Sequence, residues 1–152
     1  MTTVAVAIGS NIGDRRAHIE YAHSSLKLLL ANAHFASLHE TEPVGVPDTQ
    51  PPFLNGAAVG NTALSADELL RALQAIERDR GRERPYSKAP RTLDLDLILY
   101  GGEVKDEPDL VLPHPRFRTR RFVLEPLHEI APDLVDPVTG KTIRELLLAL
   151  PV

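Results

Sequence analysis

Cysteine is absent from this chain of 152 residues. Its absence excludes disulfide bonds and thiolate metal sites, and it is compatible with a reducing cytoplasm, where we expect the protein to work. The chain also lacks an apolar run of membrane-spanning length, and its start carries no signal-peptide pattern. We therefore expect no membrane partner.

The length of the chain bounds the number of domains. A chain of 152 residues is long enough for one well-filled core and too short for two comfortable ones. Its hydrophobic content of 43% and charged content of 25% are ordinary for a globular protein. We expect a single domain over residues 1–152, and a monomer.

The net charge of −4 is unevenly distributed. Arginines are concentrated in two short segments, 82–91 and 114–121, while the rest of the chain is acidic. An acidic protein of this kind is a poor general binder of nucleic acid. It is a better candidate for holding one compact polyanion such as a nucleoside triphosphate, because arginine forks match phosphate oxygens. The alternative is that these arginines are solvated loop residues.

Residues 91–100, RTLDLDLILY, have the alternating pattern of a β-strand that ends at two glycines. Alternation places four leucines on one face. The other face carries Asp94, Asp96, Ile98 and Tyr100. The two carboxylates lie roughly 6.5 Å apart along the strand and oppose each other's ionisation if they are buried. A divalent cation removes that conflict, and oxygen ligands suit Mg²⁺. The alternative is a half-exposed strand whose aspartates face water.

The order of the expected elements indicates a fold class. Strands are expected at 4–8, 35–38 or 35–41, 53–61 and 91–100, and helices at 14–30 and 65–81. This strand-helix-strand-strand-helix-strand order predicts an α+β fold. We expect a ferredoxin-like antiparallel sheet (β-α-β-β-α-β core) with helices packed on one face, followed by a C-terminal extension that includes a helix at 142–150.

Phe53 and Asn55 point the same way from the strand predicted at 53–61. An aromatic face beside a side-chain amide can stack on and hydrogen-bond a flat heterocycle. The alternative is a core phenylalanine next to a strand-end asparagine. The proline-rich stretch just before them, 43–52, predicts a stiff and long loop, and long loops are often functional.

Several short motifs occur in one order along nearly the whole chain: IGSNIGD, ETEPVG, FLN, QAIERDRGR, APRTLDLDLILYG, LPHPR and RRFVLEPLHEIAP. In this order they resemble the 6-hydroxymethyl-7,8-dihydropterin pyrophosphokinase family of the folate pathway. The resemblance implies transfer of pyrophosphate from ATP, the co-substrate, to the hydroxymethyl group of the reduced pterin, releasing AMP. It also implies two Mg²⁺ ions and a ferredoxin-related fold.

The resemblance also implies roles for individual residues. Asp94 and Asp96 match the carboxylates that hold both metals, and Arg82 and Arg91 match arginines that contact the triphosphate and assist transfer. The nucleotide set comprises Gln74, Glu77, Arg82, Arg84, Arg91, Ile98, His114, Arg118 and Arg120. The pterin set comprises Thr41, Val44, Gly45, Phe53, Asn55 and Phe122, with Phe53 and Phe122 sandwiching the ring.

The chain departs from the family pattern at a few positions. Lys88 stands where many relatives carry a tryptophan, Ala89 replaces a glycine, and Pro115 stands where a tyrosine is frequent. These departures concern loop closure and adenosine contacts, and leave the metal and pterin residues intact. Two alternative functions remain. A nucleotide-sugar transferase would share the D-x-D pattern, and a ligand-sensing module without catalysis would share the ferredoxin-like fold.

Overall fold

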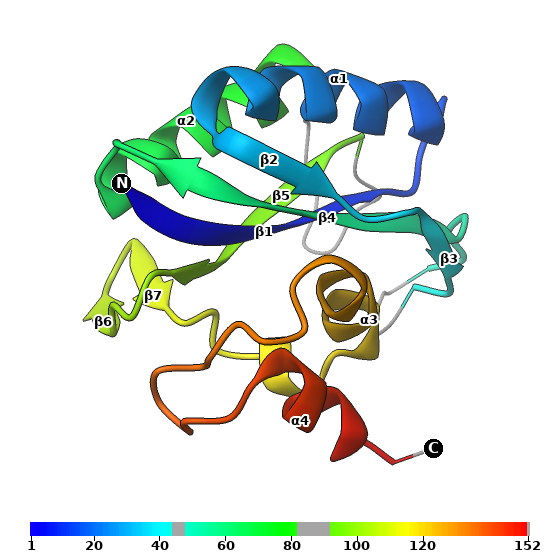
Figure 1. Ribbon diagram of the computed structural model, residues 1–152. Helices are drawn as coiled ribbons and strands as arrows, with labels where there is room; N and C mark the ends of the chain where they lie inside the picture. Colours follow the sequence, from blue (N-terminus) through cyan, green and yellow to red (C-terminus); the bar gives the residue numbers. More distant parts are fainter. Residues whose placement is uncertain (44–47, 82–91, 152) are drawn as a thin grey trace.

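An antiparallel sheet forms the centre of the protein, and helices cover both of its faces (Figure 1). The computed structural model describes residues 1–43, 48–81 and 92–151. In chain order the elements are β1 (Thr2–Ser10), α1 (Arg15–Leu29), β2 (Ala31–Phe35), β3 (His39–Thr41), β4 (Phe53–Thr62), α2 (Ala66–Asp79), β5 (Asp94–Tyr100), β6 (Lys105–Glu107), β7 (Leu110–Leu112), the 3₁₀ turn η1 (Phe117–Thr119), α3 (Arg121–Ile130) and α4 (Ile143–Leu148). Among the described residues, no helix combines the length and the apolar character needed to cross a membrane.

The strands of the main sheet follow the order β2-β4-β1-β5, and β3 also pairs with β4. Every pairing in it is antiparallel. Strand β1 is central, and its last residues lie beside the first residues of both β4 and β5. Strands β6 and β7 form a separate hairpin. The prediction of an α+β protein with an antiparallel sheet is confirmed.

Helices α1 and α2 begin next to the starts predicted at 14 and 65, and each follows a side-chain cap. The Asp14 side chain accepts a hydrogen bond from the Ala17 backbone N–H, and Ser65 and Glu68 form a capping box. Both helices pack on the same face of the sheet (Figure 1). The apolar side chains buried there include Val4, Val6, Ile8, Ile19, Leu26, Leu69 and Leu73.

The other face of the sheet is covered by α3 and α4, so the prediction that helices lie on one face is wrong for the whole chain (Figure 1). The side chains that meet there include Ala5, Ala57, Val59, Ile98, Val123, Leu124, Leu127 and Ile143. Consecutive residues of β1 show why a second layer is needed. Ala5 and Val6 point to opposite faces and both are 0% exposed, so each face has apolar surface to bury.

The strand predicted at 35–38 or 35–41 is wrong in its bounds, because β2 already ends at Phe35 and β3 begins only at His39. Phe35 pairs with Ala58, and His39 pairs with Asn55, so one extra residue lies between the two pairings. An inserted residue of this kind interrupts the ladder as a β-bulge does. The division leaves β3 as a short strand beside the first residues of β4.

A second irregularity changes the predicted faces of β5. Ala5 pairs with Leu99 and Val6 pairs with Leu97, so Ile98 is an extra residue in the strand. Up to Ile98 the predicted faces hold, because Ile98 lies on the α3 face that Asp94 and Asp96 share. For the last two residues the prediction is wrong, because Leu99 joins the cluster under α3 and Tyr100 joins the cluster under α1 and α2. The bulge places two consecutive residues, Ile98 and Leu99, in the cluster under α3 and α4.

Candidate active site

The ends of three strands meet on the α3 face of the sheet, and each contributes one polar or small residue. Asn55 of β4 lies opposite Gly9 of β1, and Gly9 lies opposite Asp94 of β5. Directly paired residues point to the same face. Neighbouring strands lie about 4.8 Å apart, so Asn55 and Asp94 are separated by roughly 10 Å across β1. A predicted pterin residue and a predicted metal residue are therefore close together.

Asp94 and Asp96 project from the same face of β5 and are half-buried. Asp96 lies opposite Ala7, whose small side chain leaves space beside the carboxylate. Within residues 1–43, 48–81 and 92–151, no group of three or more histidines, cysteines or acidic residues could hold a metal. Two carboxylates fit a magnesium ion that takes its remaining ligands from water and substrate phosphates, as Mg²⁺ commonly does.

Glu77 holds the backbone between the two aspartates. Its side chain is 3% exposed, and its Oε2 accepts the Leu95 backbone N–H at 2.8 Å. Strand β5 lies at one end of the strand order, where outward-facing N–H groups need a partner outside the sheet. Glu77 supplies such a partner and fixes the strand segment that carries both carboxylates. Its predicted nucleotide contact stays a prediction.

Gln74, one turn before Glu77 on α2, is exposed and lines a hollow of about 260 Å³. Asp67, Leu70 and Arg71 of the same helix line it as well, and Asp109 closes it from the turn between β6 and β7. Asp109 was missed at the level of sequence, because nothing local to this turn indicates that it meets α2.

Thr41, Phe53 and Asn55 form one group at the β3–β4 pair. Thr41 lies opposite Phe53, and the Asn55 Nδ2 group donates a hydrogen bond to the Thr41 hydroxyl. Asn55 is 5% exposed, while Phe53 and Thr41 are half-buried. The bond to Thr41 fixes the Asn55 amide and leaves its Oδ1 beside Gly9.

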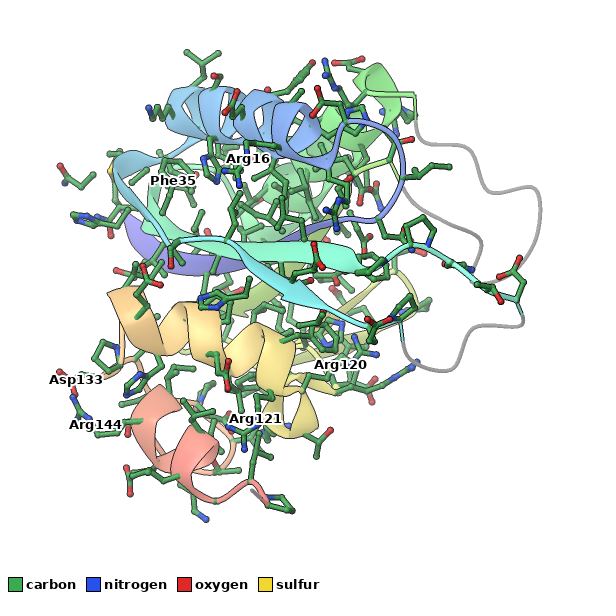
Figure 2. The ribbon with its side chains drawn as sticks, turned by 90° about the vertical axis from the view of Figure 1, so that its right-hand side faces the viewer. Arg16, Phe35, Arg120, Arg121, Asp133 and Arg144 are labelled. Carbon is green, nitrogen blue, oxygen red and sulfur yellow. The ribbon has the colours of Figure 1, made fainter. Side chains whose placement is uncertain are left out.

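Arg120 and Phe122 stand at the start of α3, on the same side of the sheet as Asn55. The Arg120 guanidinium carbon lies 5.5 Å from the centroid of the Phe122 ring, which is a cation–π contact. Figure 2 shows Arg120 below the sheet, beside α3. The structure thus joins a predicted nucleotide residue to a predicted pterin residue, whereas the sandwich of Phe53 and Phe122 stays a prediction.

His114 is attached to β5 through the backbone. Its N–H donates to the Ile98 carbonyl at 2.9 Å, and its Nδ1 accepts the Arg116 backbone N–H at 3.2 Å. Burial, followed by the charges of Arg120 and Arg116, lowers the pKa of His114 to about 4, although Asp94 acts in the opposite direction. The imidazole is therefore neutral at pH 7, and with Nδ1 accepting, Nε2 carries its proton.

Ile98 and Arg118, both predicted to contact the nucleotide, have structural partners. The Ile98 side chain is 1% exposed in the core under α3. Arg118 donates from both Nε and a terminal nitrogen to Asp136, and its guanidinium lies 5.0 Å from the Phe117 ring. Their contacts with a nucleotide stay predictions.

Five further predicted residues lie outside the described residues. They are Val44 and Gly45 of the pterin set, and Arg82, Arg84 and Arg91 of the nucleotide set.

Sequence analysis also missed a group that anchors the segment before Phe53. The Asn11 amide, 0% exposed, donates to Gln50 Oε1 at 3.0 Å, and Gln50 donates to Asp48 at 2.7 Å. Arg15 donates to the Pro52 carbonyl at 2.8 Å. In the sequence, Asn11 has the pattern of an ordinary turn residue after a strand, so no local signal predicts its burial.

Comparison with known proteins connects this geometry to a family. The family model described as 7,8-dihydro-6-hydroxymethylpterin-pyrophosphokinase (HPPK) matches residues 5–132. The chain belongs to the HPPK family. It is 43% identical over 150 residues to the 2-amino-4-hydroxy-6-hydroxymethyldihydropteridine pyrophosphokinase of Pseudomonas aeruginosa, covering 97% of this chain and 91% of that relative. It is 42% identical over 144 residues to the Synechocystis enzyme of the same name, covering 93% and 73%.

Solved structures support the HPPK fold. The wild-type Plasmodium falciparum HPPK-DHPS with SDX-DHP aligns with a TM-score of 0.74 at 15% identity, covering 97% of this chain. Another HPPK-DHPS, in complex with substrates, aligns with a TM-score of 0.72 at 12% identity. The chain spans 43% of the length of each of these proteins. At such identities the likeness shows the fold alone.

Proposed function

We propose that this HPPK family member carries out its reaction at the strand ends where Asn55, Gly9 and Asp94 lie side by side. The chain transfers pyrophosphate from ATP to the hydroxymethyl group of 6-hydroxymethyl-7,8-dihydropterin in folate biosynthesis, with release of AMP. The observation that carries the proposed location is the pairing of Gly9 with Asn55 on one side and Asp94 on the other. It brings the predicted acceptor pocket and the predicted metal site onto one face.

Asp94 and Asp96 are the residues that we assign to metal binding, with two Mg²⁺ ions as the family resemblance implies. The ions would neutralise triphosphate charge and orient its oxygens. Glu77 supports both ligands by holding the Leu95 backbone between them. The two side chains need no rearrangement of the strand to act together, because they already share a face.

Positively charged and neutral donors on the α3 side are assigned to the phosphates. Arg120 provides a fixed positive charge. His114 is neutral, so its Nε2–H can donate a hydrogen bond to a phosphate oxygen without competing with a bound cation. Arg82 and Arg91 are assigned to the triphosphate as well, on the resemblance alone. Catalysis at this site consists of positioning and charge neutralisation, which suits the loose transition state of phosphoryl-type transfer.

The pterin is assigned to the pocket of Phe53, Asn55 and Thr41, with Phe122 on its other face and Val44 and Gly45 at its edge. The Asn55 Oδ1 is an acceptor of fixed orientation, because the same amide donates to Thr41. Such an acceptor suits the N–H groups at the edge of a pterin ring. The half-buried Phe53 offers an aromatic surface for stacking.

The adenosine part of ATP is assigned to the hollow lined by Gln74. The amide of Gln74 can pair with a base edge, Leu70 offers apolar surface, and the polar rim suits a ribose. This placement puts the adenosine on the α2 side of β5 and the triphosphate near Asp94 and Asp96.

Three broader assignments complete the proposal. The core from β1 to β5 is of the ferredoxin-like β-α-β-β-α-β type, supported by the antiparallel strand order β2-β4-β1-β5. The protein acts as a monomer on small-molecule substrates. The reaction consumes ATP, and we place it in the cytoplasm for that reason.

The test is to incubate the protein with MgATP and the reduced pterin and to identify the nucleotide product. AMP formed in equal amount to the pyrophosphorylated pterin is the expected result. A product of ADP, or no turnover, would contradict the function. The matched variant is Asp96→Asn, which keeps the size of the side chain and removes its charge. A wild-type rate in this variant would contradict the proposed location and leave the reaction itself standing.

A further inference from the structure

Gly9 occupies the middle position of the row Asn55–Gly9–Asp94, and the structure shows what its missing side chain makes room for. A Cβ atom built on Gly9 would lie 3.3 Å from Asn55 Oδ1 and 3.5 Å from Cδ1 of Phe53. The first distance is shorter than nine in ten real contacts of a Cβ atom, and the second is ordinary van der Waals contact. The backbone of Gly9 is extended and does not itself require glycine. The requirement is for space.

The neighbours of this space belong to one substrate pocket. The three atoms nearest to the added Cβ come from Asn55 and Phe53, and none of them comes from Asp94. Asn55 cannot simply retreat, because its amide is held on the other side by Thr41. A methyl group at position 9 would therefore push the Asn55 amide by a few tenths of an ångström towards the place assigned to the pterin, while it would only touch the Phe53 ring.

We propose that Gly9 is a positioning residue for the pterin: its lack of a side chain lets the Asn55 amide keep its place beside β1, next to the Phe53 ring, and it acts through Asn55. The proposal rests on the function proposed above, since it takes Asn55 and Phe53 as the pterin contacts. It also predicts which ligand is affected: a side chain at position 9 should change the affinity for the pterin and leave the affinity for the magnesium–nucleotide complex unchanged.

The experiment compares Gly9→Ala with the wild-type protein. The pterin dissociation constant is measured by ligand fluorescence in the presence of Mg²⁺ and a non-hydrolysable ATP analogue, and analogue binding is measured separately. A shift of a few tenths of an ångström in a fixed binding group is expected to weaken pterin binding about tenfold, and Gly9→Val about a hundredfold or more. Affinity for the magnesium–analogue complex should stay within about twofold. Equal losses for both ligands, or no loss for the pterin, would overturn the proposal.

The matched control is Gly56→Ala, which adds the same methyl group next to Asn55 in β4 but on the opposite face. Its Cβ would meet only the end of the flexible Leu38 side chain, at 3.0 Å. The affinities of Gly56→Ala for both ligands should equal those of the wild type, whatever its thermal stability. A loss of pterin affinity as large as that of Gly9→Ala would show that any strain near Asn55 suffices, and would refute a specific role for Gly9.

A double-mutant cycle tests whether Gly9 acts through Asn55. The losses of pterin affinity in Gly9→Ala and Asn55→Ala should be clearly less than additive in the double variant, because the added methyl group then meets no amide. Additive losses would refute the mechanism.

If Gly9→Ala does not fold, Gly9→Ala/Asn55→Ala should fold, because the clash with the Asn55 amide is removed. If neither variant folds, the cost of the methyl group arises in the backbone, and the proposal is overturned. Wild-type pterin binding without AMP formation would instead contradict the proposed reaction alone.

Discussion

The two faces of the central sheet use the same strands for different purposes. On the face covered by α1 and α2, the apolar row runs along β1 from Val4 to Ile8. On the α3 face, the part under α3 and α4 is equally apolar, but the row ends in Ala7 and Gly9, beside Asp96 and Asp94. The comparison shows that one face contributes stability along its length, whereas the other is divided between packing and a polar site.

The division explains why polar residues are tolerated in the middle of a small protein. Asp94 and Asp96 stand where the α3 face is left half-open, and the leucines between and beside them remain 5% exposed or less on the other face. Burial of those leucines fixes β5 without help from the aspartates. Variants on the two faces should therefore separate activity from stability.

The largest effect is expected for Asp96→Ala on the α3 face. Loss of a metal-binding carboxylate should reduce kcat/KM by at least about 1,000-fold, which corresponds to roughly 4 kcal/mol, and weaken MgATP binding. The free energy of unfolding should change by less than about 1 kcal/mol, because the side chain is half-buried and not part of the core. AMP release and urea unfolding measure the two quantities. A wild-type rate of AMP release would contradict the assignment of the active site to the α3 face.

The reciprocal change on the α1 face is Leu26→Ala. Leu26 is 0% exposed in the core between α1 and the sheet. Its truncation should lower the free energy of unfolding by about 3 kcal/mol, through lost transfer energy and the cavity that remains. Both KM values of the folded protein should stay within about twofold of wild type. A selective rise in KM for one substrate would show that the α1 face also shapes the site.

Asn55→Ala probes the polar end of the α3 face next to the acceptor pocket. Removal of the oriented acceptor should raise KM for the pterin by about 10- to 100-fold, the cost of leaving a ligand donor unpaired. KM for ATP should be unchanged. Steady-state kinetics with each substrate varied in turn measure the two KM values. A parallel rise in both would contradict separate subsites for the pterin and for ATP.

The ion pair of Arg118 with the buried Asp136 lies behind the packed part of the α3 face, and Asp136→Asn tests its contribution. Burial alone would raise the pKa of Asp136, but hydrogen bonds from Arg118, Thr139 and Val138 outweigh it and lower the pKa to about 2. The carboxylate therefore stabilises the fold fully above its ordinary pKa of 3.8, and this contribution is lost as the pH falls towards 2.

Asp136→Asn should accordingly cost about 1–3 kcal/mol at pH 7, because the Arg118 fork loses its charged acceptor. The difference from wild type should shrink between pH 4 and pH 2. Urea titrations at several pH values measure it. A difference that does not depend on pH over this window would show that shape, and not charge, is what Asp136 contributes.

The smallest effect is expected at the outer surface of the layer that α3 and α4 form. Arg144 of α4 and Asp133 lie 2.6 Å apart with their side chains 48% and 77% exposed, far from Arg120 in Figure 2. Exposed ion pairs contribute little, so Arg144→Ala should change the free energy of unfolding by less than about 0.5 kcal/mol and leave AMP release unchanged. A loss above about 1 kcal/mol would mean that α4 depends on this contact.

Some of the site was predictable because its pattern is local. The spacing of Asp94 and Asp96, the pairing of Phe53 with Asn55 on one face, and the caps at Asp14 and Ser65 each depend on residues a few positions apart. Such spacing fixes which side chains share a face as long as the strand is regular. It did not predict the extra residue at Ile98, because residues 97–100 are all apolar, so the sequence there has no alternation that could reveal the shift.

Other parts of the site depend on residues that are distant in the sequence. The contact of Glu77 with the Leu95 backbone and the burial of Asn11 against Gln50 require the strands and helices to be docked. The meeting of Asp109 with α2 requires the β6–β7 hairpin to fold back. No local pattern carries this information.

The sequence by itself determined the order of the elements from β1 to β5 apart from the separation of β2 and β3, the starts of α1 and α2, and the face that the two aspartates share, since short-range geometry decides all three. Only the tertiary structure decided that β1 lies between β4 and β5 with Gly9 opposite both Asn55 and Asp94. That register is set by burying apolar side chains on two faces at once. It is a property of the assembled core and not of any one strand.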